Sequence, residues 1–284
     1  MPWLPLTDDL LGPLVRFIGP RESGCVPFTE QLHEERRLRL PPRRQYNAIV
    51  RLDDPDTITG AILQNVHGVY YPALDPIRPQ VEPEAISMLL HGSRRIFSIL
   101  GRTPDVEALE AAFPRTPFRR LGYHLMSQST PPPEVALPRL PRGMTVRTVG
   151  EEATRYLFDI QKNYEIEEVL LPGNTFSPSA TFDHLRQTLR EQIVLVAEVN
   201  REPIGKVNTN ARGIFYDQVG GMYTDRRVRS RGVGTALMLR LLQRIAAEHK
   251  SASLFVKKDN AAALRLYKGI GFAIEDEFRI SYYR

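Results

Sequence analysis

The stretch Val228-Arg-Ser-Arg-Gly-Val-Gly-Thr-Ala-Leu237 decides the fold, because it joins a predicted strand to a long predicted helix. The strand is predicted over Asp217 to Thr224, and the helix over Gly232 to Lys250. The helix prediction rests on one apolar stripe at helical spacing, formed by Val233, Leu237, Leu241 and Ile245. The segment therefore places a glycine-containing loop at the N-terminus of an amphipathic helix.

Such a loop favours an anion, since the first backbone amides of a helix lack internal partners and its dipole is positive there. Gly232 and Gly234 let the backbone approach a phosphate without interference from a Cβ atom. Positive charge around the loop comes from Arg226, Arg227, Arg229 and Arg231. A Walker A loop is disfavoured because Thr235 directly follows Gly234, with no lysine between them. A dinucleotide fingerprint is disfavoured because Leu237 occupies the position of its third small residue.

A second motif follows the helix and a predicted buried strand over Ser253 to Val256. It reads Asn260-Ala-Ala-Ala-Leu-Arg-Leu-Tyr-Lys-Gly-Ile-Gly-Phe272. The first loop resembles the (Arg/Gln)-x-x-Gly-x-(Gly/Ala) loop of the GCN5-related N-acetyltransferases, abbreviated GNAT, and the second segment resembles their Asn-x-x-Ala-x-x-Leu-Tyr-x-x-x-Gly-Phe motif. Both occur in the family's order. The resemblance covers about residues 142–284, and it implies direct transfer of an acetyl group from acetyl-coenzyme A to an amine.

The resemblance also implies roles for individual residues. The strand before the loop would pair with the pantetheine arm, the loop amides would bind the pyrophosphate, and Tyr267 would protonate the departing thiolate. Asn260 is interpreted as a helix N-cap, a cofactor contact, or both. The residues assigned to the cofactor are Met222, Tyr223, Thr224, Arg229, Ser230, Arg231, Gly232, Val233, Gly234, Thr235, Asn260, Ala263 and Tyr267.

The general base is less clear, because the glutamate that many members carry on the strand before the loop is absent here. Asp217 and Glu165 are the main candidates, and Glu167 and Glu168 are alternatives. A water relay to backbone carbonyls is a further alternative. On the same strand, Gly220-Gly221 predicts a bulge or a close approach of two backbones.

The predicted elements from residue 142 onward alternate as β-α-α-β-β-β-α-β-α-β, which indicates a mixed central sheet with helices on both faces. Within this order, a strand is expected over Ile193 to Val199, and a hairpin-like β segment over Phe272 to Tyr283. The region before residue 142, which spans 131–141, contains five prolines in eleven residues and is predicted to be an extended linker.

Residues 1–130 are predicted to form a second α/β domain. Strands are expected over Tyr46 to Leu52, Thr59 to Tyr71, Arg95 to Leu100 and Arg120 to Ser127, and helices over Pro83 to Gly92 and Thr103 to Phe113. No strong sequence repeat links the two halves. The order of elements nevertheless resembles the divergent acetyltransferase-like half of some two-module GNAT proteins. Because it lacks a glycine-rich loop, this half is expected to serve as scaffold or as a wall of the acceptor site.

Composition sets further bounds. The single cysteine, Cys25, excludes an intrachain disulfide framework, and scattered histidines give no expected metal site. The formal charge of +5 suits a protein that handles an anionic cofactor. The basic run His33 to Arg44 is interpreted as a solvated loop, with a nucleic-acid contact as the alternative. No secretion signal or spanning segment is evident, so a cytoplasmic protein without membrane contact is expected.

Two functions remain open on the sequence. The first is an active N-acetyltransferase acting on a small-molecule or peptide amine whose identity the sequence does not give. The second is a catalytically silent acyl-coenzyme A-binding module that senses the cofactor or binds a partner. The missing glutamate favours the silent module, whereas Tyr267 favours catalysis.

Overall fold

The computed structural model describes residues 2–34, 37–43, 46–90, 95–128, 140–170 and 173–284. Its strands are β1 Trp3–Pro5, β2 His33–Glu34, β3 Arg37–Leu38, β4 Tyr46–Asp54, β5 Thr57–Asn65, β6 Val69–Leu74, β7 Ser98–Arg102, β8 Arg119–Gln128, β9 Thr145–Val149, β10 Val194–Val199, β11 Glu202–Arg212, β12 Tyr216–Thr224, β13 Ser251–Lys257 and β14 Ala273–Tyr282. Its α-helices are α1 Leu11–Ile18, α2 Val26–Thr29, α3 Pro83–Leu90, α4 Thr103–Ala112, α5 Thr154–Tyr164, α6 Pro178–Glu191, α7 Val233–Ala247 and α8 Ala261–Gly269.

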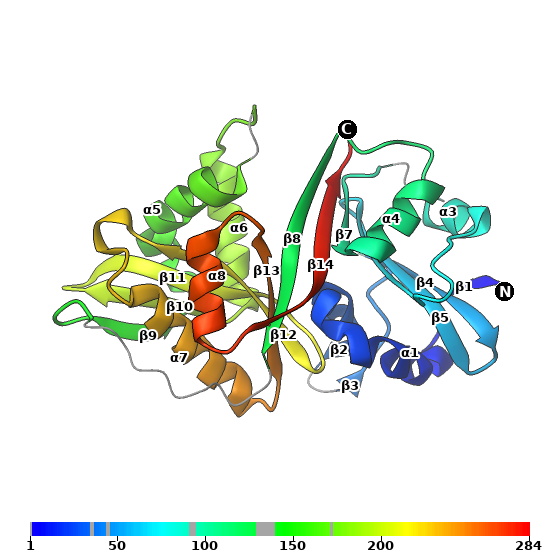
Figure 1. Ribbon diagram of the computed structural model, residues 1–284, viewed down its shortest axis with the longest axis horizontal. Helices are drawn as coiled ribbons and strands as arrows, with labels where there is room; N and C mark the ends of the chain where they lie inside the picture. The colour runs from blue at the N-terminus through cyan, green and yellow to red at the C-terminus, as the bar shows by residue number, and fades with distance from the viewer. Residues whose placement is uncertain (1, 35–36, 44–45, 91–94, 129–139, 171–172) are drawn as a thin grey trace.

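One twelve-stranded mixed sheet runs through the whole molecule, in the order β1-β4-β5-β6-β7-β14-β8-β13-β12-β11-β10-β9 (Figure 1). Read from each outer edge inward, the two halves repeat the same arrangement. Each has antiparallel outer strands followed by one parallel pair, β6 with β7 and β12 with β13. The fold is therefore an α/β arrangement built twice, although the sequence shows no strong repeat.

The two halves exchange their last strands at the centre of the sheet. Strand β8, from the N-terminal half, pairs with β13 of the C-terminal half, with Tyr123 opposite Lys257. Strand β14, from the C-terminal half, pairs with β7 of the N-terminal half, with Ile280 opposite Leu100. The exchanged strands also pair with each other, and they stand side by side in Figure 1. Each half therefore depends on the other half to complete its sheet.

Helices pack on the sheet through separate apolar clusters. Helix α7 buries Leu237, Leu241 and Ile245 against the C-terminal strands, as its apolar stripe predicts. Helices α5 and α6 bury Leu157 and Leu185 in a second cluster with β9 and β10. In the N-terminal half, α3 and α4 share one cluster and α1 belongs to another. Both halves thus have the two-sided helix covering that the sequence predicts for the C-terminal half.

Two sequence predictions differ from the structure. The segment Thr59 to Tyr71, expected as one strand, belongs to two strands, β5 and β6, joined by a turn in which Gly68 has a φ of 77°. Conversely, Phe272 to Tyr283 forms the single strand β14 rather than a hairpin. The physical reason is that this segment lacks a turn residue of the Asn-Gly type, and it accommodates Ile274 to Asp276 as a local register shift.

A buried carboxylate also joins the halves. Glu22 is fully buried, and its two oxygens accept hydrogen bonds from the amides of Ile214 (2.6 Å) and Phe215 (2.7 Å) in the β11–β12 turn. Burial raises the pKa of Glu22, and the hydrogen bonds act in the opposite direction. The N-terminal segment before β2 is thereby tied to the C-terminal sheet.

The predicted linker at 131–141 lies outside the described residues except for Leu140 and Pro141, and the division into 1–130 and 142–284 stays a prediction. Within the described part of the chain, no helix is both long and apolar enough to cross a membrane.

Candidate active site

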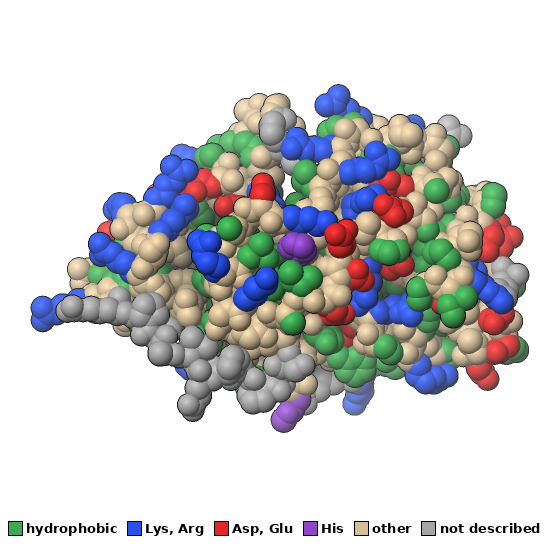
Figure 2. Space-filling view, viewed as in Figure 1, with side chains coloured by type: hydrophobic (Ala, Val, Ile, Leu, Met, Phe, Trp, Pro, Cys, Tyr) green, Lys and Arg blue, Asp and Glu red, His purple; other side chains and the backbone are tan. Residues whose placement is uncertain are grey.

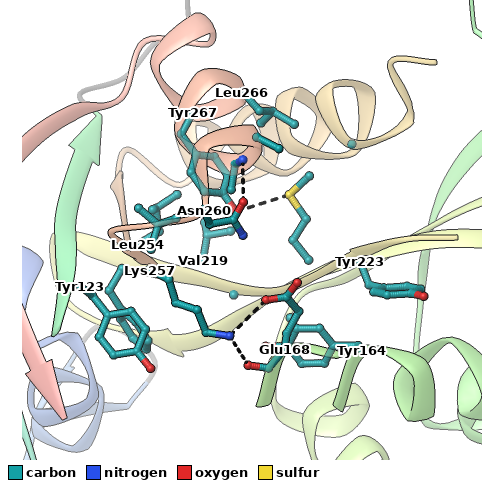
Figure 3. A pocket seen from close by; sticks show the side chains of 18 of the residues that line it. Tyr123, Tyr164, Glu168, Val219, Tyr223, Leu254, Lys257, Asn260, Leu266 and Tyr267 are labelled. Carbon is teal, nitrogen blue, oxygen red and sulfur yellow. Dashed lines mark hydrogen bonds and ion pairs between the residues drawn. The ribbon is translucent and has the colours of Figure 1, made fainter. Parts of the chain in front are cut away.

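A large cavity lies where β12 and β13 separate. These parallel strands pair only from Tyr216 to Gln218 and from Ser251 to Ser253, and beyond that point they diverge. The space between them is a cavity of about 1270 Å³ (Figure 3). Its walls come from β12, β13, the start of α7, α8, the end of α5 and the exchanged strands β8 and β14.

A bulge shapes the β12 wall. Between the pairs Lys206–Tyr223 and Asn208–Gly220, β12 contains one more residue than β11, and Gly221 has a φ of 55°. A Cβ atom on Gly221 would lie 1.9 Å from the Asn208 side-chain oxygen, so only glycine fits. The structure therefore has the bulge that Gly220-Gly221 predicts, and it lies at the cavity.

The loop at the start of α7 is arranged to bind an anion. Gly232 is the N-cap residue, and no side chain caps the first amides of the helix. Ser230 and Gly232 have φ values of 61° and 74°, which curve the loop backbone before the helix. Lys and Arg side chains gather over this loop between β12 and α7, at the left of the view in Figure 2. The chemistry of this loop fits a pyrophosphate group.

Helix α8 brings the second sequence motif to the other side of the cavity. The Asn260 side-chain oxygen accepts a hydrogen bond from the Ala263 amide at 3.0 Å, so Asn260 is an N-cap residue, as its position predicts. The Tyr267 hydroxyl donates to the sulfur of Met222 on β12 at 3.6 Å (Figure 3). Burial raises the pKa of Tyr267 well above its usual range, so its hydroxyl keeps its proton at neutral pH.

The structure brings together almost all residues that the sequence assigns to the cofactor. Every one of them lines the cavity except Arg231. The two main base candidates lie elsewhere. Asp217 is fully buried outside the cavity lining, with Lys250 at 3.1 Å and Arg212 at 3.5 Å. Glu165 is also outside the lining, and it accepts hydrogen bonds from Gln161 and Thr181.

The neighbouring glutamates differ in their surroundings. Glu167 accepts hydrogen bonds from Tyr223, Arg226 and Arg229. Although partial burial acts to raise the pKa of Glu167, these bonds lower it to about 2, which makes this carboxylate a weak base. Glu168 lines the cavity, and its carboxylate lies 3.4 Å from the Lys257 amine, which also donates to the Glu168 carbonyl oxygen at 2.9 Å (Figure 3).

Several cavity residues were not identified from the sequence. Tyr123 and Arg119 come from the exchanged strand β8, and Tyr164 comes from the last turn of α5. Burial raises the pKa of Tyr164 to about 12. No local motif marks these residues, because the strand exchange and not the nearby sequence brings them to the cavity. Of these three residues, only Tyr164 could have been found from the sequence, because it lies on the same helical stripe as Tyr156 and Ile160.

The corresponding loop of the N-terminal half has the opposite chemistry. Between β6 and α3, the carbonyl oxygens of Arg78 and Gln80 accept hydrogen bonds from the buried guanidinium of Arg51, at 2.5 and 2.6 Å. Thr59 on β5 binds the same guanidinium. This loop therefore presents carbonyl oxygens to a cation, whereas the loop before α7 leaves its amides free for an anion.

Known structures share this architecture. A Drosophila protein solved by X-ray crystallography is 14% identical and matches with a TM-score of 0.68, covering 99% of this chain and 98% of that chain. A tandem GNAT protein from the clavulanic acid biosynthesis pathway is 15% identical, with a TM-score of 0.58 and the same coverage. A GNAT-family acetyltransferase from Colwellia psychrerythraea is 11% identical, with a TM-score of 0.54 and full coverage of both chains. No curated protein sequence matches this one.

The doubled fold with its open parallel strand pair is that of tandem GNAT-like proteins. Residues 159–272 match the family model described as the acetyltransferase (GNAT) family. The matched segment includes β12 and both sequence motifs, the first of which contains the anion loop. The C-terminal half therefore contains a GNAT-family domain, and the chain as a whole has the fold of a tandem GNAT protein.

Proposed function

We propose that the protein is an acetyl-coenzyme A-dependent N-acetyltransferase that transfers an acetyl group directly to an amine. The observation that carries this proposal is the single cavity that joins the uncapped start of α7, the bulged strand β12 and the hydroxyl of Tyr267. Acetyl-coenzyme A would supply the acetyl group as a thioester.

The donor side of the cavity supports binding of the coenzyme. The amides of Val233 to Thr235 would bind the pyrophosphate, and the backbone of Met222 to Thr224 would pair with the pantetheine arm. The anion loop and β12 meet closely, since a Cβ atom on Gly234 would lie 2.5 Å from the Met222 methyl carbon. This approach would hold the coenzyme at a fixed distance from the bulge.

The acceptor side requires a base and an acid. Glu168 is the carboxylate that we assign as the base, in place of Asp217 and Glu165, because it lines the cavity opposite β13. It would accept the proton of the acceptor ammonium, directly or through a water molecule, and the neutral amine would then attack the acetyl carbonyl. As the carbon–sulfur bond breaks, Tyr267 would donate its proton to the departing thiolate sulfur. The acetylated nitrogen would release its second proton to the Tyr267 phenolate or to water, which leaves a neutral amide.

The test is release of coenzyme A from acetyl-coenzyme A in the presence of a panel of primary amines. We expect turnover with at least one class of amine, and a fall of about 10²-fold or more in turnover for Glu168→Gln. Glu191→Gln is the matched control, because Glu191 is an exposed glutamate on α6 outside the cavity lining.

The alternative is a catalytically silent acyl-coenzyme A-binding module. It is favoured by the absence of a carboxylate on β12 at the bulge, where the strand reads Val219-Gly-Gly-Met222. Tight binding of coenzyme A with no acetylation of any amine would support this alternative and contradict the enzymatic proposal.

A further inference from the structure

Arg119 is a cation at the cavity with no acidic partner. It begins the exchanged strand β8, it is half-buried, and it lines the cavity. Among the residues that the structure describes, it forms no side-chain hydrogen bond or ion pair. Its neighbour on β14 is Tyr282, with which it is paired across the two strands. The positive charge of Arg119 acts to lower the pKa values of Tyr123 and Tyr282, which burial raises.

Two other cations that line the cavity, at the end of β13, are already paired. Lys257 lies 3.4 Å from the Glu168 carboxylate, and Lys258 lies 2.6 Å from the Glu277 carboxylate. A half-buried guanidinium without a partner is unfavourable unless a ligand supplies the opposite charge. Of these three cations, Arg119 is therefore the one that remains available to a bound anion.

The surface between Arg119 and the reaction centre is apolar and aromatic. Residues Arg119, Leu121 and Tyr123 alternate along β8 and line the same cavity. Ile280 and Tyr282 of β14 continue this surface, and Leu170, which follows the π-helical turn after α5, also lines the cavity. Such a surface fits the hydrocarbon part of a ligand.

Distance sets the shape of that ligand. Tyr123 lies opposite Lys257, the last residue of β13, and Arg119 is four residues farther along β8. At about 3.3 Å per residue, the Cα atoms of Tyr123 and Arg119 are roughly 13 Å apart. An amine beside Glu168 and Tyr267 therefore needs an extended body to place an anion at Arg119.

We infer that the acceptor is an elongated primary amine with an apolar middle and a terminal carboxylate, which pairs with Arg119. One guanidinium balances one negative charge and matches the planar, two-oxygen geometry of a carboxylate. The inference rests on the proposed function, and it names the substrate class. It also gives the N-terminal half a direct role in binding the acceptor, because Arg119 belongs to that half in sequence.

Binding to the complex of the full chain with coenzyme A tests this inference without requiring turnover. The probes are N-acetyl-6-aminohexanoate and N-hexylacetamide, which differ in their carboxylate and methyl ends. Isothermal titration calorimetry should show about tenfold or more tighter binding of the carboxylate probe, as expected for a charge-assisted hydrogen bond. Arg119→Gln should abolish this preference.

Arg120→Gln is the matched control. Arg120 is the next residue on the strand, does not line the cavity, and pairs with Glu110 at 2.8 Å. It should retain the preference for the carboxylate probe. Equal binding of the two probes, equal effects of the two substitutions, or weaker coenzyme A binding by Arg119→Gln would overturn the inference. Failure of the proposed enzymatic function would appear separately, as absence of turnover with every amine despite the probe preference.

Discussion

The side-chain amine of Lys206 donates a hydrogen bond of 2.8 Å to the carbonyl oxygen of Gly221 at the bulge of β12. A second bond of 2.7 Å connects the amine to the side-chain oxygen of Asn208. Lys206 is almost fully buried, and burial lowers its pKa to about 7 despite the opposing charge of Glu165. A buried amine on the neighbouring strand therefore supports the backbone of the strand that would hold the coenzyme.

This lowered pKa predicts a pH-dependent contribution to stability. Between pH 10 and pH 7 the unfolded lysine is protonated and the folded one is largely neutral, so the free energy of unfolding falls as the pH falls through this range. In Lys206→Met this contribution is absent. The difference in unfolding free energy between the two proteins should change by about 1.4 kcal/mol per pH unit in that window.

Urea titrations at several pH values would measure this difference. Lys268→Met, which removes an exposed lysine of α8, is the control for effects of the substitution type itself. A difference for Lys206→Met that does not change with pH would show that the Lys206 amine titrates normally in the folded protein.

The anion loop predicts a second outcome. Gly232→Asp places a side chain at a φ of 74° and a negative charge before the free amides of α7. Affinity for coenzyme A should fall at least tenfold, measured by calorimetry. Gly143→Asp is the matched control, because Gly143 has the same φ of 74° and open space around it, away from the cavity. An equal loss in both variants would attribute the effect to backbone strain.

Tyr267 predicts a third outcome. Tyr267→Phe removes the hydroxyl but keeps the ring, so turnover should fall by about 10²-fold or more while coenzyme A affinity changes little. Tyr283→Phe is the control, since the Tyr283 hydroxyl is buried without a hydrogen-bond partner and lies outside the cavity lining. Unchanged turnover in Tyr267→Phe would remove the assigned acid.

The donor side of the site could be predicted from the sequence because its determinants are local. Each determinant specifies the structure of its own segment of the chain. These determinants are the apolar stripe from Val233 to Ile245, the glycines of the loop and the N-cap at Asn260. The bulge at Gly220-Gly221 could be predicted for the same reason, since two adjacent glycines in a strand indicate a close backbone approach.

The acceptor side could not be predicted, because pairings between distant segments create it. Nothing near Tyr123 or Arg119 indicates that β8 will lie beside β13 rather than complete its own half. The sequence also could not predict which glutamate faces the cavity. Whether Glu165, Glu167 or Glu168 faces the cavity depends on the π-helical turn over Glu165–Val169, which the sequence pattern did not reveal.

The strand exchange itself predicts how fragments behave. Residues 142–284 contain the whole GNAT family match but lack β8, whose Tyr123, Leu125 and Met126 are buried. Losing three such side chains at about 1.5–3 kcal/mol each removes much of the roughly 5–15 kcal/mol that stabilises a typical domain. This fragment should therefore show no cooperative unfolding in urea by circular dichroism. Residues 117–284, which restore β8 between β13 and β14, should unfold cooperatively. If both fragments unfold with the same midpoint, β8 is dispensable, and the C-terminal half is stable without the exchanged strand.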